Sequence, residues 1–382
     1  MYSLSTYGSM IADRVRVAAY EEALRKTVRK GAVVVEIGTG PGIFAVLACQ
    51  LGASRVFAIE PAEIIQVARE VAAANGCAGK IEFFEGVSNR VTLPLRADVI
   101  VSDLRGVLPL FQRHIPDIVD ARRRFLAPGG ALIPRKDTVW AAIAEAPKPY
   151  AEVVDPWDKN ALGQNLSPAR LLALNDVQKV RLGTDQLLTR HKLWTTLDYA
   201  NVENHNVRGN LEWTVERAGI GHGIVVWFDA ELAEGVGFSN APGTPETVYG
   251  SLFFPWAQPV PLAKGQTVCV SIWASLVEND YMWRWSTRIE TLDKSSASGI
   301  QFEQSQLDGA VLSASKLHKT AADYVPVLSE EGRLRRRTFE LMDGKASLEE
   351  IARRLEQEFP QRFQGWQQAL SYAGAVSQEH TK

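Results

Sequence analysis

The stretch Ala32–Gly42 reads AVVVEIGTGPG, a β-branched apolar run followed by an acid and three alternating glycines. A continuous run of this kind is typical of a strand buried on both faces, as in a parallel sheet. Gly38, Gly40 and Gly42 let the backbone turn sharply and approach a ligand without a Cβ clash. The apolar segment Ile43–Leu51 then predicts a helix whose N-terminus faces that ligand.

Two acids near this turn indicate which nucleotide it suits. Dinucleotide-binding enzymes use G-x-G-x-x-G, whereas this turn has G-x-G-x-G with Glu36 two positions before it. That pattern resembles the first motif of S-adenosylmethionine (SAM)-dependent methyltransferases. The next predicted strand, Arg55–Glu60, ends in a carboxylate 24 residues after Glu36, where it can accept both ribose hydroxyls of an adenosine. The alternative is a plain tight turn with a solvated strand end.

Composition limits the class of protein. The 382 residues are enough for two or three domains, and a net charge of −2 argues against non-specific nucleic-acid binding. Cys49, Cys77 and Cys269 lack metal-ligand spacing, so we expect no metal site and a reducing compartment. The sequence shows neither a charged-then-apolar leader nor a run of ~18 apolar residues. We therefore expect a cytoplasmic protein with no membrane or nucleic-acid partner.

Alternating strand and helix patterns over residues 31–146 predict an α/β fold with a doubly wound, mostly parallel Rossmann-like sheet. Its strands are expected at 32–37, 55–59, 80–85, 97–101 and 131–134, followed by another at 138–144. Residues 1–30, with a predicted helix at 11–28, are expected to cover the ligand site. Ligands bind at the carboxyl ends of such strands, so Asp103 after the fourth strand should lie beside them.

After Pro147 the pattern changes to separated short strands, and we expect an antiparallel β-barrel domain over residues 147–300. Residues 310–382 read as helices at 334–341, 347–359 and 366–376. Ser347 and Glu350 form a capping box at the start of the second. This C-terminal module loosely resembles a winged-helix or PqqD-like peptide-binding module. A plain helical appendage is the alternative.

The order of these modules resembles the protein arginine methyltransferase family. A short N-terminal helix, a SAM-type Rossmann domain and a barrel follow one another, and the stretch 222–229 (HGIVVWFD) is similar to that family's barrel signature. Gly237-Phe238-Ser239 after it adds to the likeness. The resemblance implies SAM as cofactor. It also implies homodimerisation through a helical arm, for which residues near 160–180 are the candidate.

The resemblance carries a cofactor site onto this sequence. It implies that Arg16 pairs the methionine carboxylate of SAM, that Gly38 and Gly40 form the turn beneath it, and that Glu60 holds the ribose. Asn89 falls where the family usually has a glutamate near the adenine amino group, and its carbonyl can accept the same hydrogen bond. The full set of expected cofactor-binding residues is Arg16, Glu36, Gly38, Gly40, Glu60, Pro61, Ser88, Asn89 and Asp103.

The acceptor side departs from the family. Its two guanidinium-clamping glutamates correspond here to Asp103 and Gln112, so one carboxylate is shorter and the other is replaced by a neutral amide. Arg105 adds positive charge where a cationic acceptor would have to lie. Asp103, Gln112 and His114 are the catalytic candidates.

The family's Thr-His-Trp loop is replaced by Thr247-Val248-Tyr249, which leaves Asp13 without its histidine partner. These departures favour a SAM-dependent methyltransferase with a non-arginine acceptor, either a peptide or a small molecule. Two alternatives stay open: a true arginine methyltransferase with a rearranged clamp, and a non-catalytic SAM-binding or scaffold protein.

Overall fold

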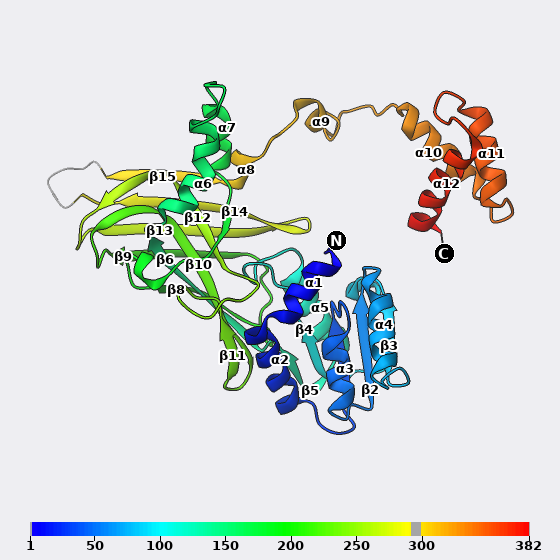
Figure 1. Cartoon of the computed structure of the whole chain (residues 1–382), viewed down its shortest axis with the longest axis horizontal. Coiled ribbons are helices and arrows are strands. Elements are labelled where there is room, and N and C mark those ends of the chain that lie inside the picture. Colours follow the sequence, from blue (N-terminus) through cyan, green and yellow to red (C-terminus); the bar gives the residue numbers. More distant parts are fainter. Residues whose placement is uncertain (1, 292–298, 382) are drawn as a thin grey trace. The chain divides into compact units, whose positions relative to one another are not determined.

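The computed structural model describes residues 2–291 and 299–381. The chain forms two compact units, Met1–Ala310 and Val311–Lys382. The first contains both the parallel sheet and the antiparallel strands. Figure 1 shows the parallel sheet with its helices on one side of this unit and the antiparallel strands on the other. No described helix is both long and apolar enough to cross a membrane.

The parallel sheet has the strand order β3-β2-β1-β4-β5. Its strands are β1 Val33–Ile37, β2 Arg55–Glu60, β3 Ile81–Glu85, β4 Ala97–Ser102 and β5 Leu126–Ile133. Its helices are α3 Ile43–Gln50, α4 Ile64–Ala74 and α5 His114–Phe125, with a short 3₁₀ turn at Ser88–Arg90. The strand order reverses at β1, so a ligand would bind at the carboxyl ends of β1, β2 and β4. This confirms the predicted fold class.

The N-terminal segment contains two helices where the sequence predicts one. They are α1 Leu4–Ala12 and α2 Arg14–Thr27. Asp13 separates them because its backbone is extended and its carboxylate caps α2, accepting from Arg16 N at 2.9 Å. The break gives α1 its own direction beside the parallel sheet (Figure 1).

The antiparallel strands form two further sheets. One has the order β7-β12-β10-β6-β8 with β11 paired to β10, and the other has the order β15-β14-β13-β9. Their bounds are β6 Lys136–Ala144, β7 Gln178–Val180, β8 Lys192–Asp198, β9 Val207–Thr214, β10 Gly219–Ala233, β11 Val236–Ser239, β12 Ser251–Leu262, β13 Thr267–Val277, β14 Asp280–Ile289 and β15 Ile300–Ser305.

Strand β6 corrects the predicted domain boundary. Residues 138–144 are assigned to the Rossmann-like domain by sequence, yet β6 pairs antiparallel with β10 and β8. The parallel sheet therefore ends with β5, and the barrel begins about ten residues earlier than predicted. A short apolar strand has the same pattern in either sheet, so its periodicity cannot reveal its partner.

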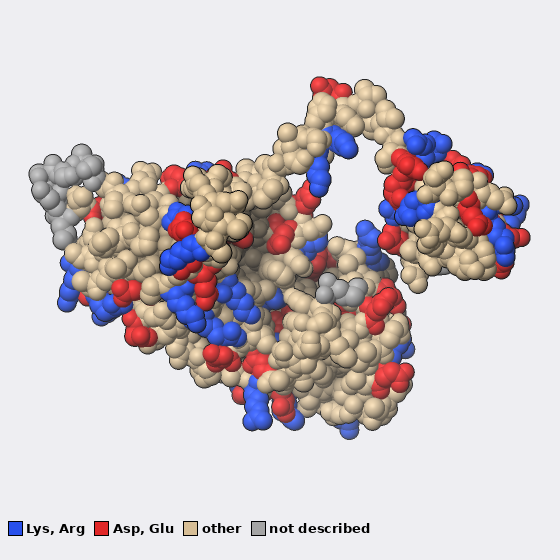
Figure 2. Space-filling view, turned by 45° about the horizontal axis from the view of Figure 1, so that its top comes forward, with Lys and Arg blue, Asp and Glu red and all other residues tan. Residues whose placement is uncertain are grey.

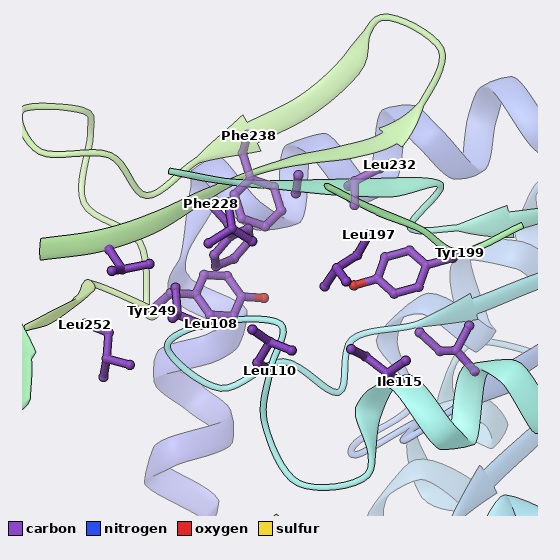
Figure 3. Packing of buried hydrophobic residues seen from close by; sticks show 14 of the residues in the cluster. Leu108, Leu110, Ile115, Leu197, Tyr199, Phe228, Leu232, Phe238, Tyr249 and Leu252 are labelled. Carbon is purple, nitrogen blue, oxygen red and sulfur yellow. The ribbon is translucent and has the colours of Figure 1, made fainter. Parts of the chain in front are cut away.

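The two parts of the first unit share one hydrophobic core. Leu110 and Ile115, which follow β4, are buried in the same cluster as Phe228, Phe238 and Tyr249 of the barrel. Figure 3 shows these side chains converging from both parts. Burial of such large apolar surfaces at the junction holds the barrel against the carboxyl edge of the parallel sheet.

The segment expected as an arm is only partly helical. The helices here are α6 Pro147–Asp158 and α7 Ser167–Ala173, and the chain then enters β7. Tyr150, Val153 and Leu174 form a small core between them. Leu162 and Leu171 point outward and are 80% and 61% exposed.

After α8 Gln306–Gly309, the second unit begins with the short helix α9 Ala314–His318. It then forms α10 Glu330–Leu341, α11 Leu348–Glu358 and α12 Trp366–His380 around its own apolar cluster. The predicted capping box is present, since the Ser347 hydroxyl accepts from Glu350 N and the Glu350 carboxylate accepts from Ser347 N. Within its described residues, 311–381, the unit contains no strand, so the β wing of a winged helix has no counterpart there.

Candidate cofactor and acceptor site

The glycine turn, Gly38–Gly42, follows β1 and adopts a conformation that other residues disfavour. Gly38, Gly40 and Gly42 have φ angles of 73°, 52° and 84°. A Cβ on Gly38 would lie 2.5 Å from Leu104 Cδ2, and one on Gly40 would lie 3.0 Å from Tyr7 Cε1. The backbone conformation therefore favours glycine throughout this turn, and a Cβ at Gly38 or Gly40 would also require Leu104 or Tyr7 to shift.

Glu60, at the end of β2, anchors the glycine turn. Its Oε2 accepts a hydrogen bond from Gly40 N at 2.9 Å, and its Oε1 accepts one from Ala62 N at 3.0 Å. Each carboxylate oxygen can accept a further bond, so the pair suits the two hydroxyls of a ribose. The donor and acceptor chemistry of this edge therefore fits a nucleoside such as SAM. Pro61, between these contacts, is exposed.

Glu36 lies beneath the turn and holds it from the other side. Its side chain is buried, and Thr39 Oγ1 donates to its Oε2 at 2.5 Å. Burial raises the pKa of Glu36 to about 8, despite the bond from Thr39. At neutral pH this carboxyl is therefore mostly protonated, which suits a residue that shapes the turn.

Ser88 and Asn89 lie in the 3₁₀ turn after β3, at the same edge of the sheet. Gly86 N donates to the Glu60 carbonyl at 3.0 Å and ties this segment to the end of β2. Ser88 is buried, and its carbonyl accepts from Arg124 Nη2 at 2.6 Å. Asn89 is exposed. The structure thus places both predicted adenine-side residues beside the Glu60 edge.

Helix α1 lies over the glycine turn. The ring of Tyr7 lies against Gly40, and burial together with the Glu60 carboxylate raises the pKa of Tyr7 to about 12. Tyr2 packs edge-on against Tyr7 with ring centroids 5.9 Å apart, and burial and the charge of Asp103 raise the pKa of Tyr2. Tyr7 therefore lies in the field of Glu60, and Tyr2 lies in the field of Asp103.

Arg16 on α2 connects the cofactor side to the acceptor side. Its Nε donates to Asp103 Oδ2 at 2.5 Å, and its Nη1 donates to the Met10 carbonyl at 3.1 Å. Among the described residues, Nη2 has no hydrogen-bond partner. The guanidinium therefore keeps a donor for a carboxylate such as that of the methionine part of SAM.

Asp103 is the centre of what we call the buried charge network: Arg16, Asp103, Arg105, Asp137 and Tyr249. Arg105 Nη1 donates to Asp103 Oδ1 at 2.9 Å, and Tyr249 Oη donates to Oδ2 at 2.6 Å. Burial alone would raise the pKa of Asp103, but the guanidiniums of Arg16 and Arg105 hold it at about 2. Asp103 is therefore an anion whose two oxygens are already bonded.

The structure separates Gln112 from this network. Gln112 has a φ of 43°, is exposed, and donates from its backbone N to Asp280 Oδ1 at 3.1 Å. Among the described residues, no hydrogen bond joins it to Asp103. Gln112 therefore lies in the loop between β4 and α5 without completing a clamp.

His114 has a supporting position instead of the predicted catalytic one. It is 1% exposed, and its Nε2 lies 2.8 Å from Tyr199 Oη, which in turn donates to Asp137 Oδ2 at 2.6 Å. Because the tyrosine donates its proton to Asp137, the imidazole is the donor to the tyrosine. Burial lowers the pKa of His114 to about 3, so the ring is neutral and enclosed.

Asp13 lacks the family's histidine partner, as expected from the sequence, but it has a backbone partner instead. Its Oδ2 accepts from Val248 N at 2.8 Å, so it holds the Thr247–Tyr249 loop through the backbone. Sequence reasoning also missed Asp137. Its position was detectable, because Asp137 is in phase with the buried apolar residues Val139 and Ala141 of β6, and a buried acid needs a cation.

Comparisons with known proteins agree with this geometry. Residues 20–146 match the family described as ribosomal protein L11 methyltransferase (PrmA), and residues 135–288 match the arginine methyltransferase oligomerization subdomain. The chain resembles a protein arginine methyltransferase-like class I SAM-dependent methyltransferase in both of these parts. The two matches meet at β6, where the structure changes from the parallel to the antiparallel sheets.

The chain covers different shares of the relatives that it matches. A probable protein arginine N-methyltransferase 6 of Arabidopsis thaliana is 30% identical over 63% of this chain, which spans 57% of that relative. Protein arginine N-methyltransferase 1 of Dictyostelium discoideum is 25% identical over 68% of this chain and 78% of its own length.

Two solved structures share the fold of this chain. The Trypanosoma brucei PRMT1 enzyme-prozyme heterotetrameric complex with AdoHcy matches with a TM-score of 0.72 at 19% identity, over 79% of this chain and 98% of that one. Arabidopsis thaliana protein arginine methyltransferase 10 matches with a TM-score of 0.69 at 20% identity, over 80% and 98%.

Proposed function

We propose that this protein transfers the methyl group of SAM to an acceptor other than a free arginine side chain, on a protein or peptide. One observation carries the proposal. Asp103, the first of the two clamp positions, has both oxygens bonded by the chain's own donors. At the second position Gln112 has neither the charge nor a contact to Asp103. An incoming guanidinium would have to displace Arg16 or Arg105 from a buried ion pair.

Methyl transfer to such an acceptor asks little of the protein beyond alignment. It is an in-line displacement at a sulfonium, and the two reactants must be held close and collinear. In this proposal Glu60 and the glycine turn hold the nucleoside, and Arg16 holds the methionine carboxylate. Asp103 then orients the acceptor. With its pKa held at about 2, Asp103 is a weak base, which favours an acceptor that attacks as a neutral or anionic nucleophile.

A true arginine N-methyltransferase is the second candidate, favoured by the names of the relatives. It requires the Asp103 ion pairs to open when substrate binds. Turnover of radiolabelled SAM against a cell extract separates the two candidates. Acid hydrolysis of the labelled protein fraction identifies the modified residue. Label on residues other than arginine supports the proposal, and label on methylated arginines supports the second candidate.

The same assay needs a matched control for SAM-dependent turnover. A Glu60→Ala variant removes the carboxylate from the Glu60 edge and should no longer transfer label to any acceptor. A Glu85→Ala variant, at the neighbouring exposed end of β3, should keep it. If neither wild-type protein nor Glu85→Ala binds SAM in calorimetry, the non-catalytic scaffold alternative is the correct one.

We also propose that the protein forms a homodimer through the α6–α7 segment. The exposed side chains of Leu162 and Leu171 support this, and so does the match of residues 135–288 to an oligomerization subdomain. Light scattering should give twice the chain mass of 42.1 kDa. A Leu162→Ser/Leu171→Ser variant should shift the mass toward the monomer. A monomeric wild-type protein would contradict the proposal.

A further inference from the structure

The guanidinium of Arg105 lies between two carboxylates inside the first unit. Its Nε and Nη2 donate to Asp137 Oδ2 and Oδ1 at 2.8 and 3.1 Å, and its Nη1 donates to Asp103 Oδ1 at 2.9 Å. The Arg105 and Asp137 side chains are both 0% exposed. A guanidinium bonded through both edges to planar carboxylates has the geometry of specific arginine recognition.

Aromatic groups complete the surroundings of this guanidinium. Tyr20 Oη accepts from Arg105 Nη1 at 2.8 Å, and Arg105 Cζ lies 5.5 Å and 5.9 Å from the ring centroids of Phe228 and Phe238. Figure 3 shows these two phenylalanines beside Tyr249 at the junction of the sheet and the barrel. Aromatic rings at this distance attract a cation. The surroundings therefore suit the faces of a guanidinium as well as its edges.

The buried charges balance only when Arg105 is present. Arg16 and Arg105 contribute two positive charges, and Asp103 and Asp137 contribute two negative charges. Without Arg105, two buried carboxylates would share the single charge of Arg16. A site of that composition would attract another guanidinium strongly.

We infer that Asp103 and Asp137 form a two-carboxylate guanidinium clamp that the chain fills with its own Arg105. Arg105 is therefore the specificity-determining residue that excludes cationic acceptors. Asp137 supplies the second carboxylate that Gln112 lacks, from β6 instead of from the loop between β4 and α5. The inference rests on the proposed function, because that proposal places Asp103 on the acceptor side.

Chemical rescue tests the clamp. An Arg105→Ala variant should be stabilised by methylguanidinium chloride in a saturable manner, by about 5 °C in melting temperature at 100 times Kd. Methylammonium chloride at equal ionic strength should have no such effect. If the variant does not fold alone, its refolding yield with and without methylguanidinium gives the same answer. Wild-type protein should not respond, because Arg105 fills the site.

Transfer of label tests whether the clamp is the acceptor site. With radiolabelled SAM, Arg105→Ala should methylate the bound methylguanidinium, and wild-type protein should not. A guanidinium nitrogen then forms a bond to the methyl carbon, the C–S bond breaks with its electron pair going to sulfur, and one N–H proton leaves to water. Rescue without labelling would overturn the specificity role, because it would show that the clamp is only structural.

A charge-neutral variant is the matched control. Arg105→Met/Asp137→Asn removes one charge of each sign, keeps similar volumes, and leaves the Arg16–Asp103 pair intact. It should fold and show neither rescue nor labelling. Equal stabilisation of this variant by methylguanidinium would overturn the clamp. The proposed function fails separately, through label on arginine in proteins treated with the wild-type enzyme.

Discussion

The glycine turn and the buried charge network lie on the two sides of one site, and they are built in different ways. The glycine turn is held by local contacts, with Thr39 three residues from Glu36 and Gly40 twenty residues from Glu60. The network joins residues 32, 87 and 146 positions apart. The glycine turn therefore needs little more than one short motif and the end of the next strand, whereas the network depends on which distant strands and helices meet.

The largest expected effect is the loss of stability when the buried charge network is broken. Arg105→Ala leaves Asp137 buried without its cation and should reduce the free energy of unfolding by about 3–5 kcal/mol. Urea denaturation followed by circular dichroism measures it. Arg123→Ala removes an arginine from an exposed pair with Glu203 and should cost about 1 kcal/mol or less. Similar losses in the two variants would show that the network is not a stabilising feature.

The next largest expected effect is a pH dependence of folding stability, which comes from Glu36 beneath the glycine turn. Glu36 has a folded-state pKa of about 8, above its unfolded value, so the folded protein retains a proton that the unfolded chain has lost. Stability should therefore fall as pH rises from about 5 to 8, by up to about 1.4 kcal/mol per pH unit from this group. Glu36→Gln should flatten that slope in denaturation curves. An unchanged slope would place a different group beneath the turn.

A smaller effect sharpens the description of the glycine turn. Gly38→Ala combines a positive φ with a Cβ 2.5 Å from Leu104, and should reduce the free energy of unfolding by about 2–3 kcal/mol. It should also weaken SAM binding. Gly76→Ala has a similar φ of 69° with open space around the new Cβ, so it should cost about 1 kcal/mol and leave SAM affinity unchanged. Calorimetric titration with SAM compares them.

The smallest effect concerns one hydrogen-bonding group. Glu60→Gln keeps the size of the side chain but replaces one acceptor oxygen with a donor, and should weaken SAM binding by about 1–2 kcal/mol. Glu85→Gln at the end of β3 is the matched control. Equal affinities for SAM in the wild-type, Glu60→Gln and Glu85→Gln proteins would show that the ribose does not bind at this edge of the sheet.

The same contrast explains how far the sequence allowed prediction. The five parallel strands, the glycine turn and the Glu60 edge were all predictable, because strand periodicity and glycine spacing act over short stretches of chain. The helix break at Asp13 and the pairing of β6 with the barrel strands were not predictable. The first depends on a capping bond, and the second depends on which neighbour a strand finds.

Only the tertiary fold decided which side chains bond to the Asp103 carboxylate. Sequence reasoning located Asp103 and noticed the charge of Arg105, but it could not show that Asp137 and Tyr249 would reach the same point. Those partners come from separate strands and loops, and their convergence is produced by packing of the barrel on the carboxyl edge of the sheet. A local pattern can specify a backbone turn because its donors and acceptors are neighbours, whereas a buried charge network exists only after distant elements have excluded water together.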